Sequence, residues 1–359
     1  MKHIAIFLLV LVLSFACQSQ NENQHHELSV DQPTRTPIEL LKDFEGHPVV
    51  FYNVENLFDT LDTPGKNDTE FTPTGSKKWG TERYLKKLTD LAEVIATPEN
   101  HQPLMVGLVE IENLPVVVDL LKTPPLDQST FRVAHFESPD RRGIDVALGY
   151  DAQRFFVVHK EAVPIKTLNF PTRDILYVKG FLKDSLEMHV FVNHWPSRRG
   201  GAERSEVNRV AAARVLRAKV DSLLAIDPNN NILIMGDFND EPDDLSITST
   251  LKARRPGGKL KSKDLVNLSF DKMREGKGTF VWDDQWNMLD QFIVSQGLFF
   301  AHHGLAVEGN EKHIMDDEKF LYQTERISPR PNKTFGRSSY FGGYSDHLAI
   351  YLYLTRNKK

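Results

Sequence analysis

Two short motifs carry most of the chemistry that this sequence offers. The first is Gly236-Asp237-Phe238-Asn239-Asp240, and the second is Ser345-Asp346-His347. Each motif pairs a carboxylate with a group that binds phosphate or transfers a proton. Each also adjoins an apolar run that is typical of a buried strand, residues 232–235 before the first motif and 348–352 after the second. Because buried strands hold the polar residues at their ends rigidly, both motifs are candidates for catalysis.

Other polar clusters lie at or beside the ends of predicted strands. They offer carboxylates, amides and imidazoles, but Cys17 is the only cysteine of the chain, which excludes a cysteine metal cluster and an intrachain disulfide. Oxygen-rich sites suit Mg²⁺, Mn²⁺ or Ca²⁺. Hydrolysis of a phosphate ester needs charge neutralisation, an aligned water and proton transfer, which a metal, a carboxylate and a histidine supply. In chain order the clusters are Asn53 with Glu55, Glu110, Asn193-His194, and Asp290.

Length and charge restrict the class of protein. The 359 residues suffice for one large α/β domain or two small ones, and the 40% hydrophobic and 26% charged residues are typical of a globular protein. The formal net charge of -5 excludes a uniformly basic nucleic-acid coat. Any anionic substrate must therefore be held by local positive charge or by a metal.

The N-terminus has the pattern of an export signal. The apolar residues 4–15 are fewer than the roughly 20 that a membrane-spanning helix needs. Cys17 follows, and the segment resembles a bacterial lipoprotein signal, in which cleavage leaves a lipid-carrying N-terminal cysteine. Ordinary secretion with loss of Cys17 is the alternative. We predict a lipoprotein-type signal peptide over 1–17, a flexible polar tether over 18–37 and a folded domain over 38–359, with the mature protein anchored at the cell envelope.

Hydrophobic periodicity predicts the elements that position the polar clusters. Helical spacing marks 80–96, 114–121 and 207–224, whereas 59–76 and 254–263 have the composition of loops. Strands outnumber helices, and two facing sheets flanked by helices would bring the strand ends together along one rim. The predicted strands are 47–51, 104–109, 144–149, 175–182, 188–192, 232–235, 280–282, 289–294 and 348–354.

The ordered motifs resemble those of the endonuclease/exonuclease/phosphatase superfamily. That group includes apurinic endonucleases, pancreatic-type deoxyribonucleases, neutral sphingomyelinases and inositol-polyphosphate 5-phosphatases. The resemblance extends from about residue 49 to 354 and is most specific at Gly236-Asp237-Phe238-Asn239 and Ser345-Asp346-His347. It implies an α/β fold, a four-layer α/β sandwich of two mixed β-sheets flanked by helices. It also implies metal-dependent hydrolysis of phosphate esters.

The resemblance further implies a metal-binding set of residues. Glu110 matches the principal metal ligand, and Asp346 matches a second carboxylate on the metal side. Asn53 matches a contact to the phosphate or the metal shell, with Glu55 close by. The implied cofactor is Mg²⁺ or Mn²⁺, with Ca²⁺ as a further option.

Catalytic roles follow from the same resemblance. Asp237 matches the group that orients or deprotonates the attacking water, and Asn239 matches a contact to phosphate or water. His347, oriented by Asp290, matches the imidazole on the phosphate. His194 matches a residue that stabilises or protonates the leaving oxygen. Which residue acts as the base differs among mechanisms proposed for the family.

Substrate contacts are predicted just after the strand that ends near His194. If Ser197 to Gly201 is a loop on the active rim, Arg198 and Arg199 would grip a second phosphate or a nucleic-acid backbone, with Ser197 beside them. The alternative is an exposed basic turn that leads into the helix.

Three functions remain open from the sequence. The first is a metal-dependent phosphodiesterase, an extracytoplasmic endonuclease-like nuclease acting on nucleic acid. The second is a phosphatase or a phospholipase C-like enzyme of the sphingomyelinase or inositol-phosphatase type, acting on small phosphoesters or lipid head groups. The third, an inactive binding protein, conflicts with the complete polar set. Because no lipid-specific insertion or inositol-phosphatase signature is present, we favour the nuclease; no protein partner is predicted.

Overall fold

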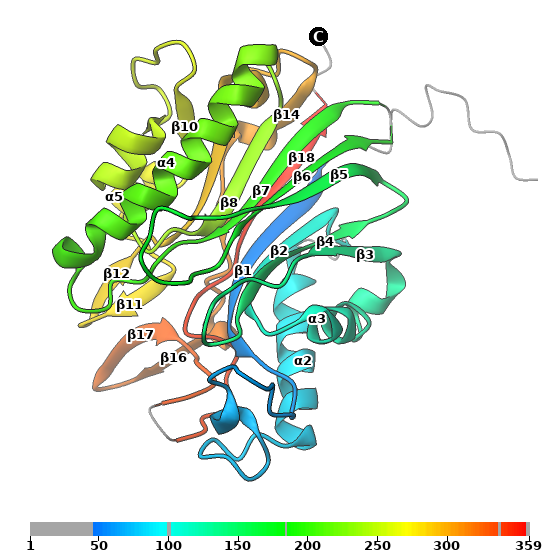
Figure 1. The fold of residues 1–359 in the computed structure, drawn as a ribbon, viewed down its shortest axis with the longest axis vertical. Helices are drawn as coiled ribbons and strands as arrows, with labels where there is room; N and C mark the ends of the chain where they lie inside the picture. Colours follow the sequence, from blue (N-terminus) through cyan, green and yellow to red (C-terminus); the bar gives the residue numbers. More distant parts are fainter. Residues whose placement is uncertain (1–45, 99–101, 184, 337–338, 357–359) are drawn as a thin grey trace, which may run out of the picture.

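Two large mixed β-sheets lie face to face between helices (Figure 1). The computed structural model describes residues 46–98, 102–183, 185–336 and 339–356. The predicted signal peptide with Cys17, the predicted tether and residues 38–45 lie outside the described residues. None of the described helices is long and apolar enough to cross a membrane.

The first sheet brings together strands from both ends of the domain. Its strands are β1 His47–Leu57, β2 Met105–Ile111, β3 Phe131–His135, β4 Asp145–Asp151, β14 Leu305–Val307, β15 His313–Ile314 and β18 Ile350–Arg356. Their order is β14-β18-β1-β2-β4-β3, and β15 also pairs with β18. Strands β1 and β2 run parallel, whereas β18 runs antiparallel to β1. The carboxyl ends of β1 and β2 therefore lie at the same edge as the amino end of β18.

The second sheet also has two parallel strands beside an antiparallel one at its centre. Its strands are β5 Phe155–Val163, β6 Ile175–Leu182, β7 Glu187–His194, β8 Ile232–Asp237, β9 Ala253–Arg254, β10 Leu265–Asn267 and β13 Asp290–Ser295. Their order is β5-β6-β7-β8-β13-β10-β9. Strands β7 and β8 run parallel and β13 runs antiparallel to β8, so the ends of β7 and β8 meet the start of β13.

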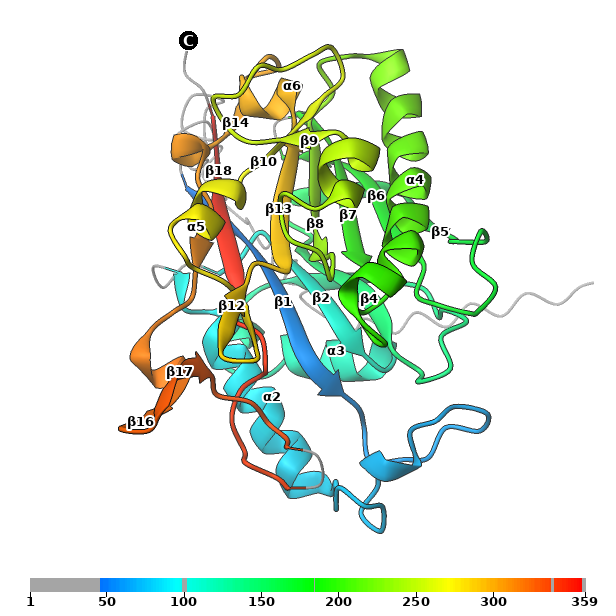
Figure 2. The same cartoon turned by 90° about the vertical axis from the view of Figure 1, so that its left-hand side faces the viewer.

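Helices and two small hairpins complete the fold. The α-helices are α2 Thr81–Ile95, α3 Leu114–Leu121, α4 Ala202–Ile226, α5 Phe270–Arg274 and α6 Gln296–Phe299. Short 3₁₀ turns occur at Thr69–Phe71, Leu126–Gln128, Glu308–Asn310 and Glu318–Phe320, and a π-helical turn at Ser246–Leu251. The hairpins are β11 Phe280–Trp282 with β12 Gln285–Asn287, and β16 Leu321–Thr324 with β17 Ile327–Pro331. Figure 2 shows both hairpins near the end of the sheets at which the arrow of β1 points.

Three hydrophobic cores separate four layers. Alternate residues of a strand point to opposite faces, so Phe51 of β1 lies in the core between the sheets, whereas Val50 packs outward against α2 and α3. In β8, Met235 likewise lies between the sheets, and Ile234 packs outward against α4. The predicted four-layer sandwich is confirmed.

The observed elements refine the predicted ones. Helix α4 begins at Ala202 rather than 207, and Arg254, placed in a predicted loop, forms part of β9. A 3₁₀ turn at Thr69–Phe71 interrupts the predicted loop 59–76. The main omission is the edge strand β5, where Phe156 and Val158 are both exposed, so its pattern lacks the apolar face that marks a buried strand.

Candidate active site

The predicted polar clusters converge where the two sheets meet at one edge. Asn53 lies in β1, Glu110 lies near the end of β2, and His347 lies just before β18. The second sheet contributes His194 at the end of β7, Asp237 at the end of β8 and Asp290 at the start of β13. Strand register explains the second group, because His194 and Asp290 lie opposite Asp237 on its two flanking strands.

Asp237 is the centre of this arrangement. Its Oδ2 accepts a hydrogen bond from Asn53 Nδ2 at 3.0 Å, and its Oδ1 accepts one from the Asn239 backbone N–H at 2.9 Å. Oδ2 also lies 3.7 Å from His194 Nε2 and 3.9 Å from His347 Nε2. Burial raises the pKa of Asp237 to about 7, an effect that His347 opposes and the Asp290 carboxylate reinforces. Asp237 is therefore a base poised near neutral pH.

His347 is held in a charged, oriented state. Its Nδ1 lies 2.7 Å from Asp290 Oδ2, and both side chains are buried. Burial acts to lower the pKa of His347, but the Asp290 carboxylate outweighs it, and the pKa lies well above its ordinary value. The Phe280 ring covers the imidazole at a centroid distance of 4.8 Å. A cationic imidazole thus points its Nε2 toward Asp237.

His194 differs electrostatically from His347. Its Nε2 lies 3.8 Å from Glu110 Oε1, and the side chain is buried. Burial, reinforced by the positive charges of Arg173 and Arg142, lowers the pKa of His194 well below its ordinary value. A neutral imidazole at this place can donate one hydrogen bond to an oxygen without adding charge to the site.

Several site residues have a strained backbone. Glu55, Asn56, Glu110 and Asn239 have φ values of 48°, 56°, 63° and 51°, in the left-handed region that residues with a Cβ seldom adopt. Pairing of β2 with β1 and with β4 shifts register beside Glu110. Such strain persists where the surrounding structure fixes the conformation, and it is common at functional sites.

The Glu55 carboxylate is occupied by backbone hydrogen bonds. Its carboxylate accepts hydrogen bonds from the backbone N–H groups of Thr334 at 2.6 Å and Phe335 at 3.0 Å. The buried ammonium of Lys87 donates to Thr334 Oγ1 at 2.6 Å, so the same segment is held from two sides. The geometry gives Glu55 a structural task, fastening residues 334 and 335 to the end of β1.

The remaining acidic groups fit a divalent cation. Glu110 and the half-buried Asp346 are carboxylates of the first sheet, and no described residue donates a hydrogen bond to the Asp346 side chain. Burial and the nearby Glu55 raise the pKa of Asp346 to about 7, and Glu110 adds to this. Crowded carboxylates of this kind are stabilised by a hard cation with oxygen ligands. A second group of potential ligand atoms, on Asp237, Asp290 and His347, lies within 4.8 Å, but the His347–Asp290 hydrogen bond already uses two of them.

The predicted substrate-binding loop lies at the rim. Ser197, Arg198 and Arg199 line a groove of about 550 Å³ together with Asn239 and the exposed Trp282. The Arg198 guanidinium already makes hydrogen bonds within the protein. It donates to the Asn239 carbonyl at 2.7 Å, to Asn287 Oδ1 at 3.0 Å and to Asp244 Oδ2 at 3.0 Å. Ser197 and Arg199 are exposed, and their contact with substrate stays a prediction.

Two basic side chains near the site did not emerge from the sequence. Arg142 contacts Asn56 Oδ1, and its Nη2 lies 3.4 Å from Glu110 Oε2. The buried Lys312 donates to the Asp290 carbonyl at 3.0 Å. The only sequence signal for Arg142 is its position in Arg-Arg-Gly before a strand, and Lys312 has none, because its partner lies 22 residues away.

Comparisons with solved structures agree with this fold. An endonuclease/exonuclease/phosphatase family protein from Bacteroides thetaiotaomicron is 17% identical, with a TM-score of 0.55 over 88% of this chain and 99% of that chain. A mannosyl-6-phosphatase from the same organism is 16% identical, with a TM-score of 0.53 over 86% and 99%. D. rerio TDP2 in complex with a single-strand DNA product is 14% identical, with a TM-score of 0.54 over 87% and 99%. No curated protein sequence matches the chain.

The sequence also matches a family as a whole. The model of the endonuclease/exonuclease/phosphatase family aligns with residues 48–356, which include both motifs and every predicted site residue. Members of this family are hydrolases that act on phosphate esters and generally depend on a divalent metal. This chain therefore belongs to the endonuclease/exonuclease/phosphatase family.

Proposed function

We propose that this protein is a Mg²⁺- or Mn²⁺-dependent phosphodiesterase that cleaves nucleic acid outside the cytoplasm, anchored through a lipid on Cys17. The observation that carries the chemical part is the convergence on Asp237 Oδ2, which has Asn53 Nδ2, His194 Nε2 and His347 Nε2 within 3.9 Å. A base near neutral pH, a cationic imidazole and a neutral imidazole are thus arranged around one point. Such a set suits hydrolysis of a phosphoester.

The residues divide the work of in-line hydrolysis. Asp237 accepts the proton of the attacking water, and Asn53 holds the Asp237 carboxylate in position. The cationic His347, kept charged by Asp290, stabilises the negative charge that develops on the phosphate oxygens. The neutral His194 donates a hydrogen bond to the leaving oxygen. A divalent cation held by Glu110 and Asp346 would neutralise phosphate charge.

A polymeric substrate is supported by the rim. The groove beside Asn239 carries Arg199 and Trp282 on its exposed wall, and a nucleic-acid strand offers phosphates and bases to such groups. A phosphatase acting on a small phosphoester is the alternative, and neighbours of both kinds share the fold.

One set of assays separates these functions. Residues 18–359 with Mg²⁺ are expected to nick plasmid DNA or cleave RNA and to hydrolyse bis-p-nitrophenyl phosphate, a phosphodiester. EDTA should abolish turnover, and Asp237→Ala or His347→Ala should retain less than about 1% of it while remaining folded, since each removes a group that acts in the transition state. Near-normal turnover by either variant, or full activity in excess chelator, would refute the mechanism. Turnover of phosphomonoesters, sphingomyelin or inositol phosphates alone would favour the alternative.

The location needs its own measurement. Metabolic labelling with a fatty-acid analogue should mark the wild-type protein but not Cys17→Ser. An unlabelled wild-type protein in the culture medium would support plain secretion instead.

A further inference from the structure

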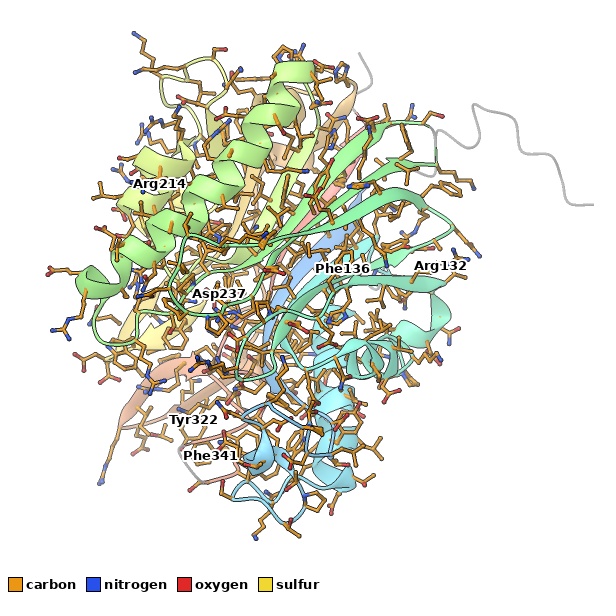
Figure 3. All side chains as sticks on the ribbon, viewed as in Figure 1. Arg132, Phe136, Arg214, Asp237, Tyr322 and Phe341 are labelled. Atoms are coloured by element: carbon orange, nitrogen blue, oxygen red, sulfur yellow. The ribbon has the colours of Figure 1, made fainter. Side chains whose placement is uncertain are left out.

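A second groove is distinct from the one that Trp282 lines, and the two share no lining residue. Its volume is about 560 Å³, and the β16–β17 hairpin forms one wall of it. Figure 3 labels Tyr322 and Phe341, which lie near one another in that view, at the end of the molecule that carries the hairpin. The lining residues are Tyr322, Ile327, Arg330, Pro331, Asn332, Lys333, Tyr340 and Phe341.

The groove exposes two large aromatic rings. Tyr322 is 47% exposed and Phe341 is 59% exposed, whereas the nearby Phe320 is buried against Tyr344. The Phe341 ring lies over the backbone at Gly336, where an added Cβ would meet its Cζ at 2.8 Å, so one edge of the ring is held in place. Exposed aromatic side chains that share a groove mark a binding surface rather than a failure to pack.

Positive charge accompanies these rings. Lys333 is exposed and has no ion-pair partner within the described part of the chain. Arg330 also lines the groove, but its charge is paired, because its Nη2 is 2.5 Å from Asp284 Oδ1 of the β11–β12 turn. In a molecule with a net charge of -5, the exposed ammonium of Lys333 in this groove favours an anionic ligand.

The floor of the groove is fastened to the active site. Glu55 binds the backbone N–H groups of Thr334 and Phe335, one and two residues after Lys333. On the other side, the Ser345 N–H donates to the Asn332 carbonyl at 3.2 Å, and the Ser345 hydroxyl donates to the Asn53 carbonyl at 2.7 Å. A ligand in the groove would therefore be held at a fixed distance from Asp237 and His347.

We propose that this groove binds an unpaired segment of the nucleic-acid substrate. Tyr322 and Phe341 stack on bases, and Lys333 contacts a phosphate, while the scissile phosphate lies at the active site. The inference rests on the proposed nuclease function and adds a preference for single-stranded or frayed substrates. A neutral polysaccharide would use the rings but not the charges, and a lipid surface would favour a protruding apolar patch over a hollow.

The test compares a long substrate with one too small to reach the groove. We expect Tyr322→Ala/Phe341→Ala to raise KM for a 12-nucleotide single-stranded oligonucleotide about 30-fold, since stacking of each base on an aromatic ring accounts for roughly 5-fold or more. Lys333→Gln should raise KM severalfold and reduce its dependence on salt. Turnover of bis-p-nitrophenyl phosphate should not change in either variant. Phe156→Ala is the matched control, because Phe156 is 52% exposed on the edge strand β5, outside both grooves.

The outcomes separate this inference from the proposed function. Failure of the wild-type protein to cleave any oligonucleotide would remove the nuclease function itself. Wild-type cleavage with an unchanged KM in the double variant and in Lys333→Gln would overturn the groove alone. If the double variant loses turnover of both substrates, anisotropy of a labelled oligonucleotide bound to Lys333→Gln decides, and unchanged affinity there overturns the inference. Binding of anionic vesicles that depends on these residues, with KM unaffected, would assign the groove to a membrane instead.

Discussion

Replacing Asp290 by Asn tests the electrostatic core of the mechanism. The Asp290 carboxylate keeps His347 charged through a 2.7 Å hydrogen bond between buried groups. A hydrogen bond to a charged group contributes about 1.5–3 kcal/mol, and one between neutral groups about 0.5–1.5 kcal/mol. The difference of about 1–2 kcal/mol corresponds to a loss of roughly 5- to 30-fold in kcat.

The second oxygen of Asp290 makes the substitution more severe. Asp290 Oδ1 is buried and has no hydrogen-bond partner among the described residues. An Asn that keeps its oxygen toward His347 would bury an NH₂ group there without an acceptor, at a cost of about 1–3 kcal/mol in stability. An Asn turned the other way would donate to Nδ1 and impose the wrong tautomer. Either orientation lowers kcat, so about 5-fold is a lower limit.

The assay is kcat for bis-p-nitrophenyl phosphate between pH 6 and 9, with unfolding by urea as the stability measurement. Without the carboxylate, the pKa of His347 falls, and its positive charge is lost at lower pH. The deficit in kcat should therefore grow as pH rises. Asp283→Asn, an exposed carboxylate in the β11–β12 turn, is the control. A kcat for Asp290→Asn within twofold of wild type at every pH would refute the assigned role of the pair.

Two further predictions concern the frame around the site. Burial lowers the pKa of Lys312 to about 7, against an ordinary 10.5, so the folded state holds fewer protons than the unfolded state between these values. The unfolding free energy of the wild type should therefore rise relative to Lys312→Met by about 2–3 kcal/mol from pH 7 to 9, as measured in urea; a pH-independent difference would contradict a buried, neutral lysine. A Cβ at Gly236 would lie 2.6 Å from the Asn193 carbonyl oxygen, so Gly236→Ala should cost about 1–3 kcal/mol and push Asp237 away from His194, lowering kcat at least tenfold. Gly80→Ala, where a Cβ meets nothing within 4 Å, should leave kcat unchanged, and equal effects of the two substitutions would contradict this reading.

The strands that carry the site could be predicted from the sequence because they are buried on both faces. Residues 232–235 form a continuous apolar run, and the two sides of β8 pack into different cores. The edge strand β5 was not predicted because several of its residues are exposed and it lacks an apolar face. Helix α4 begins five residues before the predicted start, because its first turn is polar and carries no apolar periodicity. Its start is instead set by the backbone at Gly201, where φ is 111°.

From the type of a residue we could predict its position at the rim, but not its hydrogen-bond partners. Glu55 lies beside Asn53 as expected, yet its oxygens bind N–H groups 279 and 280 residues away. Arg198 lies on the substrate side as expected, yet Asn287 and Asp244 occupy its donors. The local sequence predicts the strand end at which a residue lies. Which partner it meets depends on long-range packing, which periodicity does not encode.

The site forms where the two sheets meet, because neither sheet carries all of the site residues. The first sheet supplies Asn53, Glu110 and Asp346-His347, and the second supplies His194, Asp237 and Asp290. The two hydrogen bonds that order the site, Asn53–Asp237 and His347–Asp290, both join one sheet to the other. Their lengths are therefore set by how closely the sheets pack, and at Gly107 an added Cβ would meet Met235 Sδ at 2.4 Å. Catalytic geometry and the packing of the inner core are thus one constraint, and changes to inner-core residues should act on kcat as well as on stability.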